Sequence, residues 1–163
     1  MTTIAEIIEE WNQEAVLTQK VLDALTDASL EQQVFPNGRT LGRLAWHTVT
    51  SIPEFLSAFG ISQAGSHDTV PTSAQEIAET FRTINADVVN KIQELQDDSL
   101  KQVQNLFGRE MTNSAVFSLL IKHTIHHRGQ LTVLMRQAGL PVPGIYGPSL
   151  EEWGQIGMKP PAI

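Results

Sequence analysis

Two histidines four residues apart are the residues of this chain whose type and spacing point most directly to chemistry. His123 and His127 occur in the stretch His123-Thr-Ile-His-His127-Arg-Gly-Gln, within a long helical pattern. On an α-helix they project from one face, about 6 Å apart along the axis. Two neutral imidazoles at this spacing can hold one divalent metal ion, and a histidine from another helix would complete a set of three. His47, in Leu44-Ala-Trp-His47-Thr-Val, is the candidate third ligand.

The helical period indicates where these side chains point. At 100° per residue, His123 and His127 lie within about 20° of the centre of their helix's apolar stripe, and so face the interior. Burying two imidazoles without partners is unfavourable, and a metal ion would satisfy both. The alternative is a pair of buried histidines bonded to other polar groups. His47 lies at the edge of its own apolar stripe, where it could instead cap a backbone carbonyl group.

Three other residues are candidates for orienting a ligand or a substrate around such a centre. His126 and Gln130 lie beside the apolar stripe that carries His123 and His127. Tyr146 occurs further along, in the segment after the last helical pattern. Glu54 is the carboxylate that could reach the site as a base, although a surface position is favoured for it.

Composition narrows the classes of function. The 163 residues are 41% hydrophobic and 18% charged, as expected for one globular domain with a single core. A net charge of −7 argues against a nucleic-acid partner, because few cations are available to neutralise phosphates. The chain has no cysteine, so any metal must bind histidine, carboxylate or water, and no protein thiol can act as a nucleophile.

The sequence also indicates the cellular location of the protein. The first residues, Met-Thr-Thr-Ile-Ala-Glu, have neither the basic nor the apolar region of a signal peptide. No apolar run approaches the roughly 18 residues that cross a bilayer. We therefore expect a cytoplasmic protein that acts on a small molecule and does not associate with membranes.

Four helical patterns must position the histidines, and residues 61–72 are predicted to form a loop between the second and the third. The fold class is predicted to be all-α, an antiparallel up-down-up-down four-helix bundle in which the second and fourth helices run parallel. Residues 1–163 are expected to form one domain, with an irregular tail, 140–163, packed on the bundle. The predicted helices span residues 3–25, 40–59, 73–95 and 112–138.

A second apolar face runs along the last helix. It consists of Phe117, Ile121 and Ile125, which would fit either contacts in a dimer or packing of the tail. Periodicity alone does not separate the two interpretations.

The quoted residues resemble the DinB/YfiT-like family of metal-binding proteins. The matching pieces are Leu41-Gly-Arg-Leu-Ala-Trp-His47, His123-Thr-Ile-His-His127-Arg-Gly-Gln-Leu, and Val142-Pro-Gly-Ile-Tyr-Gly-Pro followed by Glu152-Trp153. They occur in the family's order and span most of the chain. The resemblance implies a four-helix bundle, often a homodimer, with a divalent ion, typically zinc or nickel, held by three histidines. These map onto His47, His123 and His127.

The resemblance implies more than one kind of activity. Some members are similar to S-transferases that activate a low-molecular-weight thiol such as bacillithiol or mycothiol, and others to maleylpyruvate isomerases with a thiol cofactor. The expected function is therefore metal-dependent transfer or activation of a low-molecular-weight thiol toward an electrophilic substrate. The alternatives are a non-catalytic stress protein that binds a metal or small ligand, and a metal-dependent hydrolase that would need a carboxylate base.

Overall fold

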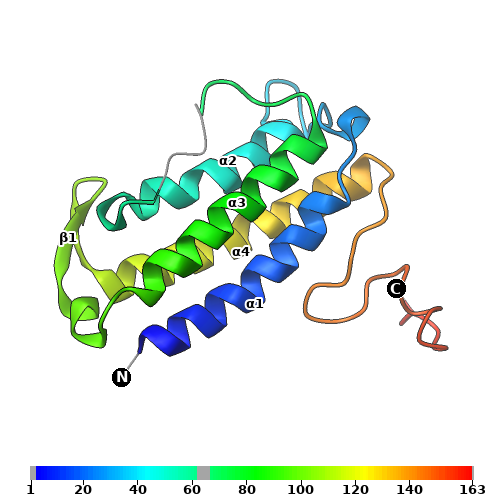
Figure 1. The fold of residues 1–163 in the computed structure, drawn as a ribbon. Helices are drawn as coiled ribbons and strands as arrows, with labels where there is room; N and C mark the ends of the chain where they lie inside the picture. Colours follow the sequence, from blue (N-terminus) through cyan, green and yellow to red (C-terminus); the bar gives the residue numbers. More distant parts are fainter. Residues whose placement is uncertain (1–2, 62–66, 163) are drawn as a thin grey trace.

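Four α-helices form most of the structure, a computed structural model that describes residues 3–61 and 67–162 (Figure 1). Of the predicted loop 61–72, residues 62–66 lie outside the described residues. Short 3-10 helices follow α1 (η1, Asp27–Ser29), α2 (η2, Ser57–Phe59) and α3 (η3, Asp97–Lys101). None of the helices in the described ranges combines the length and apolarity needed to cross a bilayer. The helices are α1 Ile4–Asp23, α2 Leu41–Phe55, α3 Ala74–Gln93 and α4 Asn113–Gln137.

Each α-helix begins at a side chain that caps it. The hydroxyl groups of Thr3, Thr40, Ser73 and Thr112 accept hydrogen bonds from the third backbone N–H of the helix that follows, at 3.0–3.4 Å. At Thr3 a capping box is complete, because the Glu6 carboxylate accepts a hydrogen bond from the Thr3 backbone N–H. These caps fix where the helices start, and therefore the register in which α2 and α4 present their histidines.

The helix directions differ from the predicted up-down-up-down order. Leu44 and Leu134 line one cavity, whereas further along α2 the Phe55 ring contacts His123, with ring centroids 4.9 Å apart. Residue numbers rise along α2 as they fall along α4, so this neighbouring pair is antiparallel rather than parallel. Figure 1 shows the same opposed course of the two helices.

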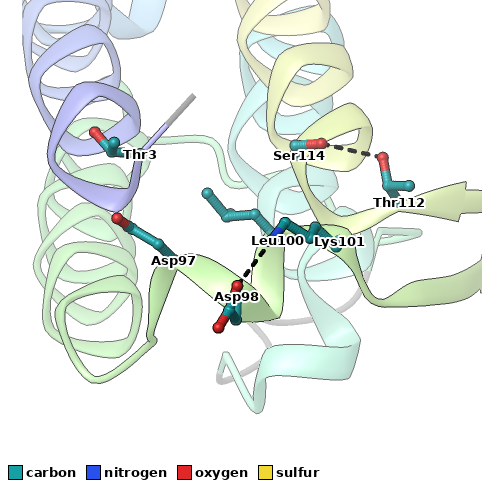
Figure 2. A pocket seen from close by; sticks show the side chains of 7 residues that line it. All are labelled: Thr3, Asp97, Asp98, Leu100, Lys101, Thr112 and Ser114. Carbon is teal, nitrogen blue, oxygen red and sulfur yellow. Dashed lines mark hydrogen bonds and ion pairs between the residues drawn. The ribbon is translucent and has the colours of Figure 1, made fainter. Parts of the chain in front are cut away.

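The contacts of α1 with α4 and α3 give the directions of the remaining helices. It begins beside α4, because Thr3 and Thr112 line one cavity at that end of the bundle (Figure 2), and Glu14 meets Arg128 further along. Helices α1 and α4 are therefore parallel. Trp11 donates to Asn85 at 2.7 Å and the side chain of Gln19 donates to the Ala78 carbonyl, so α1 and α3 are antiparallel. The resulting order is up-down-down-up.

The long connection between α2 and α3 explains the difference. Residues 56–73, 18 in number, could extend over roughly 60 Å, whereas the 15 residues of α2 cover about 22 Å. A connection of that length can return along the bundle and start α3 in the direction of α2. Only short connections force consecutive helices to be antiparallel neighbours.

A β-hairpin joins η3 to α4, so the all-α prediction is wrong in this segment. Strands β1 (Val103–Leu106) and β2 (Arg109–Thr112) pair antiparallel, with Leu106 opposite Arg109. The two residues between them, Phe107 and Gly108, both have positive φ, 51° and 81°, as a two-residue type I′ turn requires. Each strand has only four residues, too few for a readable alternation.

Apolar side chains from all four helices form one core, and the predicted second face of α4 belongs to it. Phe117 and Ile121 are buried, and Ile125 packs partly buried against the same cluster. The Phe117 ring lies 5.0 Å from that of Phe59, between centroids. The chain itself therefore covers most of this face.

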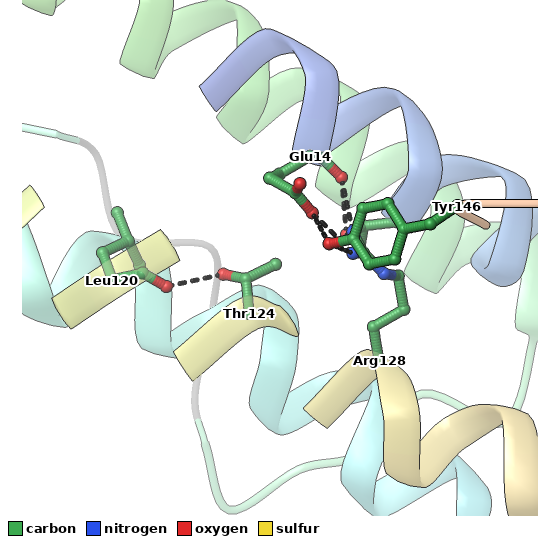
Figure 3. Close-up of polar contacts among 6 residues, drawn as sticks. Glu14, Leu120, Thr124, Arg128 and Tyr146 are labelled. Atoms are coloured by element: carbon green, nitrogen blue, oxygen red, sulfur yellow. Dashed lines mark hydrogen bonds and ion pairs between the residues drawn. The ribbon is translucent and has the colours of Figure 1, made fainter. Parts of the chain in front are cut away.

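A buried ion pair ties α1, α4 and the tail together. Arg128, 2% exposed, donates to the Glu14 carboxylate at 2.5 Å, to the Glu14 carbonyl and to the Thr18 hydroxyl (Figure 3). The Tyr146 hydroxyl accepts from Arg128 at 2.6 Å and donates to Glu14 at 2.8 Å. Beyond Tyr146, Arg136 of α4 pairs with Glu151 of the tail. One end of this network is thus in the bundle interior and the other in the tail.

Removing the guanidinium from this network should strongly destabilise the protein. We expect Arg128→Met to lower the free energy of unfolding by about 3–5 kcal/mol, because it leaves the Glu14 carboxylate buried without a cation. Tyr146→Phe removes one hydroxyl group and should cost only about 1 kcal/mol. Urea unfolding of both variants against the wild type measures the difference; equal losses would contradict the assigned role of Arg128.

Candidate metal centre

The packing of α2 against α4 brings the three predicted histidines together. The ring of His47 lies 4.7 Å from that of His127 and 5.2 Å from that of His123, between centroids. The rings of His123 and His127 are 4.3 Å apart. One nitrogen from each ring lies within 4.8 Å of the others, so the group could hold a metal ion. No described residue adds a carboxylate to this group.

The nitrogen atoms face one another. His127 Nε2 lies 3.1 Å from His123 Nε2. On its other side, His127 Nδ1 lies 2.7 Å from the Gln130 amide oxygen, which can accept the Nδ1 proton and leave Nε2 with a lone pair. Two nitrogens bound at 2.0–2.1 Å to a tetrahedral ion lie about 3.4 Å apart, close to the observed separation. The orientation of the helix α4 pair therefore suits a shared ion.

Burial keeps these rings neutral. It is the largest cause that lowers the pKa of His47 from 6.5 to about 4, followed by the charges of His127 and Arg39. Burial, followed by the effect of His127, likewise lowers the pKa of His123 to about 4. The pKa of His127 is also lowered, mainly by burial and against the hydrogen bond with Gln130. At neutral pH all three rings are unprotonated, which is the form that binds metal ions.

The predicted orienting residues lie in different places. Gln130 contacts His127 directly, as described above. His126 is exposed on α4, with its ring 5.0 Å from that of His127. Tyr146 bonds to Arg128 and Glu14, so its hydroxyl group is committed to the network between α1 and α4 instead of the histidine group. Consecutive helical residues point about 100° apart, which separates the surroundings of Arg128 from those of His127.

Beside the three histidines lies a polar cluster that sequence reasoning did not find. His67, within the predicted loop 61–72, is half-buried against α2. Thr50 Oγ1 lies 2.8 Å from its Nδ1 atom and Glu54 Oε1 lies 2.7 Å from its Nε2 atom. Its ring is 6.4 Å from that of His47. Glu54 thus contacts His67, outside the group of three histidines. The spacing of His47, Thr50 and Glu54 is the signal that places them on one helical face.

A cavity of about 450 Å³ opens beside His127. Five apolar residues form most of its wall, and Arg39, His127 and Gln130 supply its polar groups. Val34, Phe35 and Arg39 come from the segment before α2, and the other apolar residues from α2 and α4. A small molecule in this cavity would contact the histidine group. The apolar residues are Val34, Phe35, Leu44, Val133 and Leu134.

A second cavity, of about 470 Å³, lies where α1 and α4 begin (Figure 2). The charged residues in it are already engaged with the protein. Asp97 accepts a hydrogen bond from the Ile4 backbone at 2.8 Å, and Lys101 pairs with Asp98 at 2.8 Å. This cavity therefore does not present a group of ligands comparable to the three histidines.

The lowered pKa values predict acid sensitivity of the metal-free protein. In the unfolded chain the imidazoles take up protons near pH 6.5, whereas in the folded protein His47 and His123 do so only near pH 4. The unfolded state therefore binds more protons across this interval, and the free energy of unfolding falls as the pH falls from 6.5 to 4.

Urea unfolding in a chelator at pH 7 and pH 4.5 measures this effect. We expect His123→Gln to reduce the loss of stability between the two pH values, because Gln cannot be protonated. His126→Gln, which changes an exposed histidine of the same helix, is the matched control. An unchanged pH dependence in His123→Gln would contradict the assignment.

Comparisons with known proteins agree with this architecture. The sequence model of the DinB family matches residues 1–158. The uncharacterized protein YrdA of Bacillus subtilis (strain 168) is 44% identical over 164 residues, which cover 99% of this chain and 98% of that protein.

Two crystal structures are also similar. That of a DinB-like protein from Bacillus cereus ATCC 10987 has a TM-score of 0.84 at 49% identity, covering 88% of this chain and 98% of that one. That of YjoA, a DinB-like protein from Bacillus subtilis, has a TM-score of 0.67 at 19% identity over 83% of this chain and 96% of that one, a likeness of fold alone. The chain belongs to the DinB family.

Proposed function

We propose that His47, His123 and His127 bind one divalent metal ion, zinc or nickel, and that the protein uses it to activate a low-molecular-weight thiol toward an electrophilic substrate. The observation that carries the metal site is the convergence of three neutral ring nitrogens within 4.8 Å. Imidazole is a good ligand for both ions. Three protein ligands leave at least one position for a substrate, as in catalytic rather than closed structural sites.

The donor set favours an electrophilic role for the ion. Neutral imidazoles leave its full positive charge in place, and such an ion lowers the pKa of a thiol or water in contact with it. The residues of the chain would hold the ion and orient its ligands. The Gln130 amide oxygen fixes the proton on His127 Nδ1, which keeps the lone pair of Nε2 available for the ion. The cavity beside His127 gives space for a substrate next to the three nitrogens.

The thiol must be a separate molecule, because the chain has no cysteine. In a transfer reaction the thiol loses its proton and the sulfur electron pair forms a bond to the electrophilic carbon. The leaving group departs with the electrons of its own bond to that carbon, and the proton released from the thiol balances its charge. The products are a thioether and the protonated leaving group.

The alternative functions make different demands on the structure. A hydrolase would benefit from a carboxylate base at the metal, but Glu54, the candidate for this role, contacts His67 outside the group of three histidines. A non-catalytic protein that binds a metal or a small ligand would use the same histidines and the same cavity without turnover. The distinction between transfer and binding therefore rests on activity measurements.

Metal content tests the site. We expect about one zinc or nickel ion per chain in protein purified without an affinity tag, and loss of that ion in His47→Ala. Gln130→Ala should weaken metal affinity by roughly 10–100-fold, because it removes an outer partner of a ligand. His126→Ala, which alters an exposed histidine, should keep the ion. Elemental analysis and competition with a chelator measure these effects; stoichiometric metal in His47→Ala would contradict the ligand assignment.

Thiol dependence tests the reaction. We expect metal-loaded protein to consume an electrophilic substrate only when a low-molecular-weight thiol is present, and His47→Ala to react at the uncatalysed rate. Mass spectrometry detects the thioether product. Turnover without thiol would indicate a hydrolase, and absence of turnover across a panel of thiols and electrophiles would indicate a binding protein.

A further inference from the structure

The cavity beside His127 has a floor at the histidine group and a wall formed by the segment before α2. This segment, residues 33–40, is folded back on itself: Gln33 and Thr40 form a β-bridge, and the Gly38 N–H donates to the Phe35 carbonyl at 3.0 Å. Asn37 has a φ of 66°, which allows the tight reversal. The segment is therefore an ordered wall of the cavity.

Neighbouring residues fix the position of the Phe35 ring and of the backbone next to Arg39. The ring of Phe35 covers Gly38 so closely that a Cβ atom at residue 38 would lie 3.2 Å from its Cε1 and Cζ atoms. Arg39 directly precedes Thr40, whose hydroxyl group caps α2 through the Arg43 N–H. The helix cap thus fixes the backbone next to Arg39, and glycine at residue 38 allows the ring to lie there.

The apolar part of the cavity is open to solvent. Val34, Phe35 and Val133 are 59%, 63% and 54% exposed, although each is a large apolar side chain that folding would normally bury. They lie together around one cavity rather than singly on the surface. Grouped exposed apolar side chains of this kind mark binding sites in soluble proteins.

The charge in the cavity has one sign. Arg39 is the cation among the described residues that line it, and none of those lining residues is acidic. The charge of Arg39 lies near the histidine group, because Arg39 and His127 line the same cavity. A divalent ion on those histidines would add to this positive potential. An anion would be favoured there and a cation disfavoured.

We propose that this cavity binds the substrate of the metal centre, and that Arg39 pairs with a carboxylate group of a small, partly apolar molecule. The apolar part of that molecule lies between Phe35 and Val133, and its other end reaches the histidine group. This inference rests on the proposed function for its account of the reaction, but the anion preference follows from Arg39 and the cavity wall. The carboxylate belongs either to the thiol or to the electrophile.

A matched pair of probes tests whether the cavity prefers a carboxylate to a neutral group. Isothermal titration calorimetry would compare 4-phenylbutyrate with its neutral analogue 4-phenylbutyramide, on metal-loaded and metal-free protein of measured metal content. We expect the carboxylate to bind about tenfold more tightly to the wild type, as for a charge-assisted pair. In metal-free protein Arg39→Gln should remove that difference. Arg109→Gln, which changes an exposed arginine of the hairpin, should retain it.

A second variant tests the apolar wall. Phe35→Ser should weaken the binding of both probes by a similar factor and leave their ratio unchanged, because it removes apolar contact without changing charge. A ratio near one in the wild type would overturn the inference. So would a carboxylate preference of the metal-free protein that persists in Arg39→Gln, since the anion would then pair with another group.

The failure of this inference is distinguishable from failure of the proposed function. Metal-loaded protein without a carboxylate preference would overturn the inference and leave the metal centre in place. Protein that binds no metal but shows a preference dependent on Arg39 would refute the proposed function and retain the anion site. To locate the carboxylate in the reaction, carboxylated and neutral versions of the thiol and of the electrophile would be compared for their dependence on Arg39.

Discussion

The antiparallel packing of α2 against α4 is the interaction on which the candidate site depends. It brings His47 beside two histidines that the helical repeat has already aligned. Two facing imidazoles can share one proton in a hydrogen bond between their Nε2 atoms. If the third ring also turns its lone pair toward the other two, a further hydrogen bond requires an added proton, and burial opposes the charge of that proton. A metal ion would satisfy all three nitrogens at once.

The orientation of α4 about its own axis is held by interactions on two sides. His127 faces α2, whereas the next residue, Arg128, faces α1 and is bound there by Glu14 and Thr18. A rotation of α4 that displaced His127 from His47 would also break a buried ion pair, which is costly. Tyr146 extends this constraint to the tail. Residues 127 and 128 therefore combine a candidate ligand with the residue that holds its helix in this orientation.

The sequence predicts the parts of the structure that depend on local periodicity. The helix starts and the alignment of His123 with His127 could be anticipated, because caps, apolar stripes and helical spacing are local signals. The place of His47 beside them was implied by the family resemblance, since periodicity alone left it open. The direction of α3 could not, since a connection of 18 residues permits either orientation. The hairpin at Val103–Thr112 is too short to show alternation. Tyr146 was expected near the histidines, but its hydroxyl group is bound at a buried ion pair that only the three-dimensional packing creates.

The absence of acidic ligands links the proposed chemistry to the proposed substrate. A carboxylate or thiolate ligand would partly neutralise a divalent ion, whereas three imidazoles leave both of its charges to act on whatever enters the cavity. Arg39 adds a further positive charge at the same opening. With a bound ion, such a site would stabilise a thiolate and would also attract an anionic substrate, so both proposed effects depend on the same positive charges.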